Sequence, residues 1–178
     1  MVPEARLEQT EHGLVPTGDG WFVLNAREAR WRSAEGRGAI TDLEGETEFP
    51  QLGIHVFVLG PGEPISMYHW EVDQEDFLIV SGEALLIVEG EERPLRQWDF
   101  VHCSRETRHT IVGAGDNRCV VVAVGSRTTT GPGWGGYTVD KAALRHNAGV
   151  EEETTQEDVA YANVAHRKHT RYRDGWLP

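Results

Sequence analysis

The feature that most constrains the fold is a run of short apolar segments in the middle of the chain. The segments are rich in Val, Ile, Phe and Leu, which favour β-strands, and turn residues such as Ser81 and Gly82 separate them. We expect strands at residues 53–59, 65–70, 75–80, 84–88, 98–103, 107–112 and 118–124. Because no helix-length periodic segment lies between them, the sequence predicts an all-β sandwich or barrel.

The two ends of the chain differ from this middle region. A length of 178 residues suits one domain with ordered tails. We divide the chain into a polar N-terminal lead-in at residues 1–20, a barrel at 21–127 with a motif core at 53–125, and a C-terminal extension at 128–178. We expect an edge strand at 21–24, and short helices at 141–146 and about 156–164. The basic last dozen or so residues are expected to form a loosely held tail.

The net charge of the chain limits the classes of molecule that it is expected to bind. A formal charge of −12 opposes binding to nucleic acid or to anionic membranes, and suits a protein that holds a small molecule in a pocket. The longest apolar run is far too short to span a bilayer. Cys103 and Cys119 both fall in strand-like runs, which favours buried, reduced thiols. We therefore expect a soluble, cytoplasmic protein.

One group of residues combines imidazole and carboxylate side chains. His69 and Glu71 are two apart on an expected strand, so they share a face, and Glu75 opens the next strand. Gly82 lies in the following tight turn, where a positive φ is expected. With His109 from a distant strand, these groups suit one divalent ion such as Fe, Mn, Ni or Zn. Two histidines and one carboxylate with open positions favour non-heme Fe(II) oxygen chemistry.

The spacing of these residues resembles the motifs of the cupin superfamily. Residues 62–82 read Gly-x6-His-x-Glu-x3-Glu-x6-Gly, similar to the first cupin motif, G-x5-H-x-H-x3-4-E-x6-G. Residues 99–109 resemble the second motif, G-D-x4-P-x-G-x2-H. The resemblance covers residues 53–125 and implies a conical β-barrel of the RmlC-like jelly-roll type. It also implies an inward-facing metal held by His69, Glu75 and His109, and a homodimer.

The sequence departs from the two motifs at several positions. Glu71 stands where the first motif has its second histidine, and it is expected either to be a fourth ligand or to act as a general base. Trp98, Ser104 and Glu106 replace the glycine, proline and glycine of the second motif. These three replacements raise the question of whether the loop keeps its conformation.

Alternation along the strands predicts the surroundings of the site. Phe77 and Ile79 share the face of Glu75, and Ile111 shares that of His109, so these three are expected to line an apolar pocket. His55 is a weaker candidate for the same pocket. His102 is expected to be a core or wall residue.

The sequence therefore predicts a metal-dependent cupin acting on a small organic molecule, with a non-heme dioxygenase preferred. One alternative is an isomerase or lyase that uses the metal as a Lewis acid. Another is a cupin that binds a small molecule without catalysis. In a third, the barrel has lost its metal and the same side chains only line the pocket, at the cost of burying an unpaired carboxylate.

Overall fold

The computed structural model describes residues 1–129 and 131–178. Its strands are β1 (Arg6–Thr10), β2 (Gly13–Thr17), β3 (Arg30–Ser33), β4 (Ala39–Asp42), β5 (Leu52–Leu59), β6 (His69–Glu71), β7 (Glu75–Ser81), β8 (Glu83–Val88), β9 (Glu91–Arg96), β10 (Phe100–Cys103), β11 (His109–Ala114), β12 (Cys119–Ser126), β13 (Gly135–Tyr137) and β14 (Lys168–Arg171). Its helices are α1 (Lys141–Arg145) and α2 (Glu157–Ala160). None of the helices in these two ranges has the length and apolar character needed to cross a membrane.

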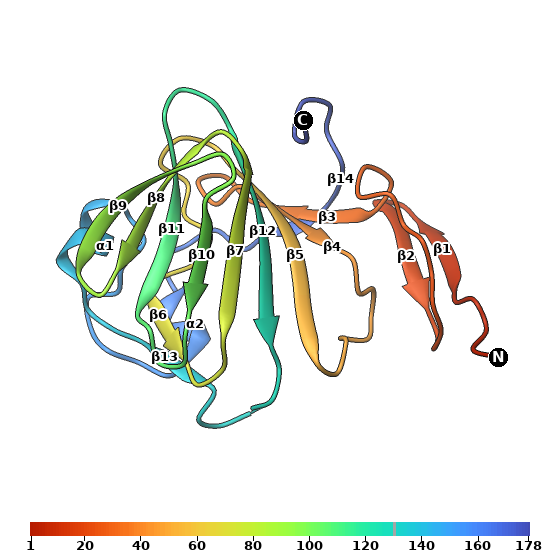
Figure 1. Cartoon of the computed structure of the whole chain (residues 1–178), viewed down its shortest axis with the longest axis horizontal. Coiled ribbons are helices and arrows are strands. Elements are labelled where there is room, and N and C mark those ends of the chain that lie inside the picture. The colour runs from red at the N-terminus through yellow and green to blue at the C-terminus, as the bar shows by residue number, and fades with distance from the viewer. Residues whose placement is uncertain (130) are drawn as a thin grey trace.

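Two antiparallel sheets form the barrel that occupies most of Figure 1. One sheet has seven strands in the order β10-β7-β12-β5-β4-β3-β14, and the other has five in the order β13-β6-β11-β8-β9. The main core combines side chains of both sheets, such as Phe57 and Val121 from the first and Leu86 and Ile111 from the second. The prediction of an all-β barrel with short C-terminal helices is confirmed.

The two-residue period of the strands decides which side chains face the interior. On β7, Phe77 and Ile79 are 3% and 0% exposed, whereas Leu78 between them faces outward and is only half-buried. Glu75 lies on the same inward face at the start of this strand. The alternation therefore brings a carboxylate to one end of an otherwise apolar interior.

The structure differs from the expected elements at both edges of the barrel. Residues 65–70 are extended only near β6, and strand β9 was not expected. β9 pairs only with β8, and its mostly exposed side chains include Pro94, which is tolerated at a sheet edge. An exposed edge strand carries no apolar alternation, so the sequence gives no signal for it. The helix expected at 156–164 is shorter, because only Glu157–Ala160 are helical.

The N-terminal lead-in is more ordered than expected. Residues 1–20 contain the hairpin β1–β2, which projects from one end of the molecule in Figure 1. The edge strand expected at 21–24 is absent, and within that range only Trp21 forms a bridge, to Glu4.

The prediction of a loosely held C-terminal tail is wrong. β14 pairs with β3 along four residues, from Lys168↔Ser33 to Arg171↔Arg30. Beyond it Trp176 is 7% exposed and its ring lies 5.1 Å from that of the fully buried Trp31. Burial of this large aromatic side chain stabilises the docked tail, because it removes a large apolar surface from water.

Candidate metal centre

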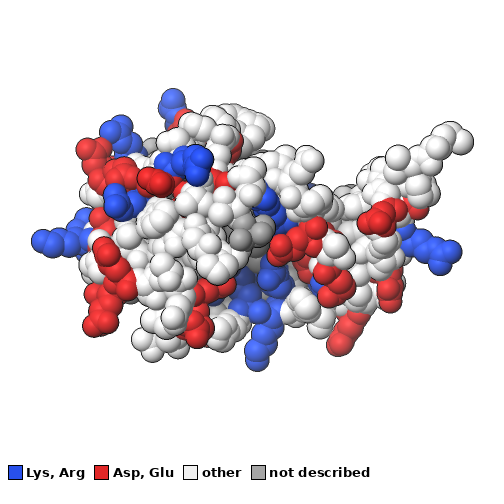
Figure 2. Space-filling view, turned by 90° about the horizontal axis from the view of Figure 1, so that it is seen from below, with Lys and Arg blue, Asp and Glu red and all other residues white. Residues whose placement is uncertain are grey.

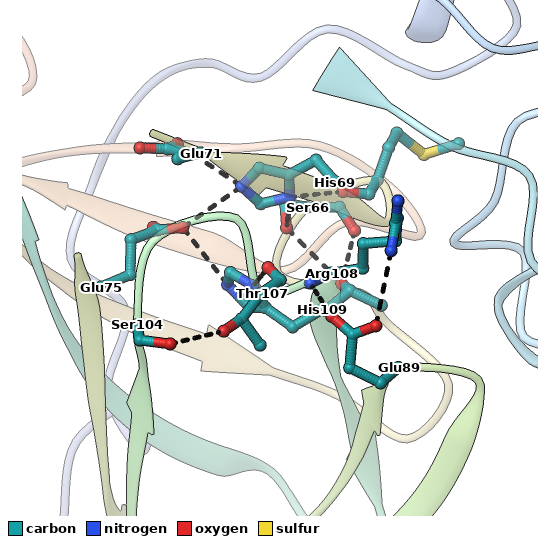
Figure 3. A network of polar contacts seen from close by, with 11 residues as sticks. Ser66, His69, Glu71, Glu75, Glu89, Ser104, Thr107, Arg108 and His109 are labelled. Carbon is teal, nitrogen blue, oxygen red and sulfur yellow. Dashed lines mark hydrogen bonds and ion pairs between the residues drawn. The ribbon is translucent and has the colours of Figure 1, made fainter. Parts of the chain in front are cut away.

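The three ligands expected from the sequence come together inside the barrel. His69 begins β6, Glu75 begins β7 and His109 begins β11, and the two histidines are direct cross-strand partners. Their side chains point toward one another in Figure 3. One ligand atom from each residue lies within 4.8 Å of the other two. The sheet pairing therefore makes one cluster from residues forty positions apart in the chain.

The ligand atoms of this cluster do not satisfy one another. Glu75 Oε2 lies 3.4 Å from His69 Nε2 and 3.2 Å from His109 Nε2. These are ion-pair distances, but Glu75 Oε2 and His109 Nε2 are both buried without a hydrogen-bond partner among the described residues. Buried polar atoms are rarely left in this way. Their convergence on one point fits a cation held between them.

The other nitrogen of each histidine fixes which ring atom faces the cluster. His69 Nδ1 lies 2.8 Å from the carbonyl oxygen of Met67, and His109 Nδ1 lies 3.0 Å from that of Thr107. A carbonyl oxygen only accepts, so each Nδ1 carries the proton and donates it. In the neutral ring Nε2 then presents a lone pair to the cluster, the arrangement of a histidine that binds a metal.

The charges of the cluster shift its pKa values strongly. Burial lowers the pKa of His69, but the nearby carboxylates of Glu71 and Glu75 outweigh burial and raise it to about 10. Burial likewise lowers the pKa of His109, and its contacts with Cys103 and Glu75 raise it to about 9. Burial raises the pKa of Glu75, yet the two histidines hold it well below its usual range. Without metal, the two imidazoles therefore bind protons where a cation would otherwise lie.

Glu71 lies beside the three ligands. Its Oε1 is 3.5 Å from His69 Nε2, and its side chain is 28% exposed, compared with 17% for Glu75. Figure 3 shows its carboxylate and that of Glu75 next to the same nitrogen of the His69 ring. The backbone amide of Glu106 donates to the Glu71 carbonyl oxygen over 2.7 Å, which ties the second-motif loop to this residue. This position suits a fourth ligand or a proton-transfer group.

A cavity of about 700 Å³ opens onto the cluster. His69, Glu71 and Glu75 line it, together with the predicted pocket residues His55 and Phe77. Ile79 and Ile111 do not line it, because both are 0% exposed in the core. Strand alternation gives the face of a side chain but not its depth in the barrel, and Ile79 and Ile111 lie two residues further along their strands than Phe77 and His109.

Two other histidines lie outside the cluster. His55 Nδ1 lies 3.2 Å from the carbonyl oxygen of Thr41, and burial lowers the pKa of this histidine, so it faces the cavity as a neutral ring. His102 lies on the outer wall of the barrel, where its Nδ1 is 2.7 Å from Asp76 Oδ1. The neighbouring Cys103 points into the core instead.

The second-motif loop keeps an unusual backbone despite its substitutions. Trp98 has a φ of 74° and Glu106 a φ of 66°, the left-handed region that glycine adopts most easily. These are the two positions where the cupin pattern has glycine. The backbone conformation is therefore retained although the residue that favours it has been replaced.

Several cavity residues come from segments that showed no sign of a site in the sequence. Trp134 precedes β13 and Tyr137 ends it, and their rings lie 6.3 and 6.0 Å from the His69 ring. Tyr161 lies just after α2, and Arg37 and Arg167 also line the cavity. In the sequence Arg167 belongs to a basic C-terminal segment, and such segments are usually exposed to solvent, so it was not expected at a site.

Comparison with known proteins supports the fold. The family model of the cupin domain matches residues 55–125. No curated protein matches the chain. A sugar phosphate isomerase of the cupin superfamily from Silicibacter pomeroyi is 20% identical, with 86% of this chain and 82% of that chain covered and a TM-score of 0.51. A predicted oxalate decarboxylase from Thermotoga maritima is also 20% identical, with 58% and 97% covered and a TM-score of 0.51.

A third structure is more similar in sequence than these two, but a smaller part of each chain aligns. It is a protein from Acidithiobacillus ferrooxidans for which sugar phosphate isomerase activity has been suggested, 28% identical, with 43% of this chain covered and a TM-score of 0.41. The chain spans about half of that protein, since 51% of it is covered. The family model and the first two structures support a cupin barrel, and the names of those two proteins describe different activities.

Proposed function

Residues 55–125 of this chain form a cupin domain, and from that premise we propose that the protein is a metal-dependent cupin acting on a small organic molecule. The observation that carries the proposal is the cluster of His69, Glu75 and His109, in which two buried ligand atoms lack hydrogen-bond partners among the described residues. The cavity beside the cluster has the size of a small-molecule site.

The residues around the cluster have distinct roles in this proposal. His69, Glu75 and His109 would hold Fe, Mn, Ni or Zn, and the backbone carbonyls of Met67 and Thr107 orient the two imidazoles. When bound, the ion supplies either a site for dioxygen chemistry or Lewis-acid polarisation of a substrate oxygen.

Glu71 would move a proton. It lies at the cavity wall next to His69 and is not one of the three clustered ligands. A carboxylate in that place can take a proton from a substrate bound beside the metal centre and return it later. It can do so in an oxygenase or in an isomerase.

Non-heme dioxygenase chemistry is the preferred reaction, because two histidines and one carboxylate leave open positions for substrate and dioxygen. An isomerase or lyase is the alternative. The names of the Silicibacter pomeroyi and Thermotoga maritima proteins describe an isomerase and a decarboxylase, and likenesses at 20% identity support the fold alone. A cupin that binds its ligand without turnover would contain the same cavity.

The first experiment is elemental analysis of the purified protein beside a His69→Ala/His109→Ala variant. We expect close to one equivalent of iron, manganese, nickel or zinc in the wild type and none in the folded variant. A folded wild type that neither contains nor takes up metal would overturn the proposal. Oxygen uptake by the Fe(II)-loaded protein over a panel of catechols, thiols and β-diketones then separates an oxygenase from an isomerase or a binding protein.

A homodimer is proposed for the outer face of the seven-stranded sheet. Phe100, Leu78, Val122 and Val56 are cross-strand partners in one row on β10, β7, β12 and β5. Phe100 is 64% exposed, and the other three are half-buried. Val56 packs partly against the cluster of Trp31 and Trp176, and the rest of the row supports burial against a second copy. Light scattering after gel filtration tests it, with Phe100→Ser expected to give a monomer.

A cytoplasmic location is also proposed. Cys103 and Cys119 are both free and buried, which suits a reducing compartment. Fractionation of the source cells would test it, and recovery of the protein from outside the cytoplasm would contradict it.

A further inference from the structure

Three arginines line the cavity of the metal centre, and they differ in how their charge is balanced. Arg127 Nη1 donates to both oxygens of Glu44, over 3.0 and 2.9 Å, and to the carbonyl oxygen of Phe49. Arg37 and Arg167 form no ion pair with a carboxylate in residues 1–129 and 131–178. Two of the three cavity cations therefore lack a counter-ion in this part of the protein.

Arg167 is held with part of its guanidinium free. Its Nε and Nη2 donate to the carbonyl oxygen of Arg37 over 3.3 and 2.6 Å, and Nη2 also donates to that of Ile65 over 3.2 Å. The guanidinium carbon lies 5.8 Å from the centre of the Phe57 ring. No described residue accepts a hydrogen bond from Nη1. These contacts fix the side chain at the cavity wall without neutralising it.

The environment of Arg167 is unfavourable for an unpaired charge. Burial, and then the nearby charge of Arg37, lower the pKa of Arg167 to about 10. A cation removed from water is stabilised when an anion binds it with good geometry. An anionic ligand at this place would offset both the lost hydration and the repulsion between the two arginines.

An aromatic wall connects the two arginines with the metal ligands. The Arg37 guanidinium lies 4.3 Å from the centre of the Tyr161 ring, and this ring is 5.7 Å from that of Tyr137. The Tyr137 ring is in turn 6.0 Å from the ring of His69. A single organic molecule in the cavity can therefore contact the arginines at one end and the metal centre at the other.

We propose that the substrate is a small organic anion whose carboxylate or phosphate binds Arg167 and Arg37 while its reacting end lies at the metal centre. The planar guanidinium fork matches the oxygens of either anion. At the opposite end Glu71 and Glu75 repel an anion, so the cavity charge also sets the orientation of the molecule. The inference rests on the proposed function for its reacting end, but the anion site does not need the metal.

The surface of this acidic protein also has a basic area. Although the formal charge is −12, Figure 2 shows basic side chains gathered near the middle of one face, with acidic groups on both sides of them. Glu48 and Glu157 also line the cavity, and neither forms an ion pair with an arginine among the described residues. Since four carboxylates and three arginines of the described residues line the cavity, the unpaired arginines attract an anion through direct contact and not through a net positive charge.

The test is binding of benzoate to the metal-free protein in the presence of a chelator, measured by calorimetry, with neutral benzamide as the isosteric comparison. We expect benzoate to bind at least about tenfold more tightly than benzamide. Arg167→Gln and Arg37→Gln should each weaken benzoate at least about tenfold and leave benzamide unchanged. Arg96→Gln, an exposed position on β9, is the matched control and should bind as the wild type does.

Inorganic phosphate in place of benzoate distinguishes the two anion classes, since tighter binding of phosphate indicates a phosphate ester and tighter binding of benzoate a carboxylate. Arg167→Lys keeps the positive charge but removes the planar guanidinium that pairs with two anion oxygens. Circular dichroism checks the fold of each variant. The inference is overturned if neither anion binds, if benzamide binds as well as benzoate, or if the folded arginine variants bind like the Arg96→Gln control. Metal content is measured separately, so failure of the metal site does not imitate failure of the anion site.

Discussion

Metal binding should release protons, and their number tests the electrostatics of the cluster. At about pH 7.5, two histidines with the ordinary pKa of about 6.5 hold only about 0.2 protons between them. With the pKa of His69 raised to about 10 and that of His109 to about 9, they hold about two. A divalent ion needs both Nε2 lone pairs, so its binding must displace these protons.

The sign of the pH dependence follows from this competition. Because the metal-free histidines are protonated below about pH 9, the metal affinity should rise with pH through the neutral range, by up to about 100-fold per pH unit when two protons leave. With ordinary pKa values the affinity would be nearly constant above about pH 7.5.

Calorimetric titration with Zn(II) or Mn(II) in buffers of different ionisation enthalpy measures the protons released for each ion bound. We expect between one and two protons at about pH 7.5, and Glu71→Gln should reduce the number, since Glu71 helps to raise the pKa of His69. Glu48→Gln is the matched control, because Glu48 lines the same cavity without pairing with either histidine. Release of about 0.2 protons by the wild type would refute the reasoning.

Three pairs of substitutions test the fold. Glu106→Gly should stabilise the protein to urea by about 0.5–1 kcal/mol, since relief of the left-handed conformation exceeds the entropy cost of glycine; Glu106→Ala should not. Trp176→Ala should cost about 3 kcal/mol and expose the tail to protease, whereas Trp21→Ala, 53% exposed, should change stability little; equal losses would contradict the docking of the tail. Gly82→Ala should cost more than Gly36→Ala, because both have a positive φ but only at Gly82 would a Cβ meet the backbone of a neighbouring strand.

The barrel strands could be predicted because their side chains alternate between core and surface. Segments such as 75–80 and 118–124 place apolar residues on an interior face, and a buried interior leaves that signal in the sequence. β9 and β1 lack it because none of their side chains is fully buried, and β2 lacks it because its buried residues do not alternate with exposed ones. The docking of the tail depends on the pairing of β14 with β3 and on the packing of Trp176 against Trp31, 145 residues earlier, and no local pattern reveals contacts over such a separation.

The clustering of His69, Glu75 and His109 could be predicted because the motif fixes both their face and their strand. The depth of Ile79 and Ile111 could not, because alternation does not say how far along the barrel the cavity extends. The arginines of the cavity are a different case. Arg37 lies in a loop and Arg167 just before the last strand, and only the pairing of β14 with β3 brings them together.

The second-motif segment keeps the backbone conformation of the motif without its glycines. Trp98 and Glu106 keep the φ of the glycines that they replace, so the barrel requires the conformation rather than the residue. A left-handed non-glycine residue costs about 1–2 kcal/mol, and such a cost persists only where surrounding structure holds it. At Glu106 the holding contact is its amide hydrogen bond to the Glu71 carbonyl, which a glycine would also make. Glu106→Gly should therefore gain stability with unchanged metal content, whereas a loss of metal would assign the Glu106 side chain to the site itself.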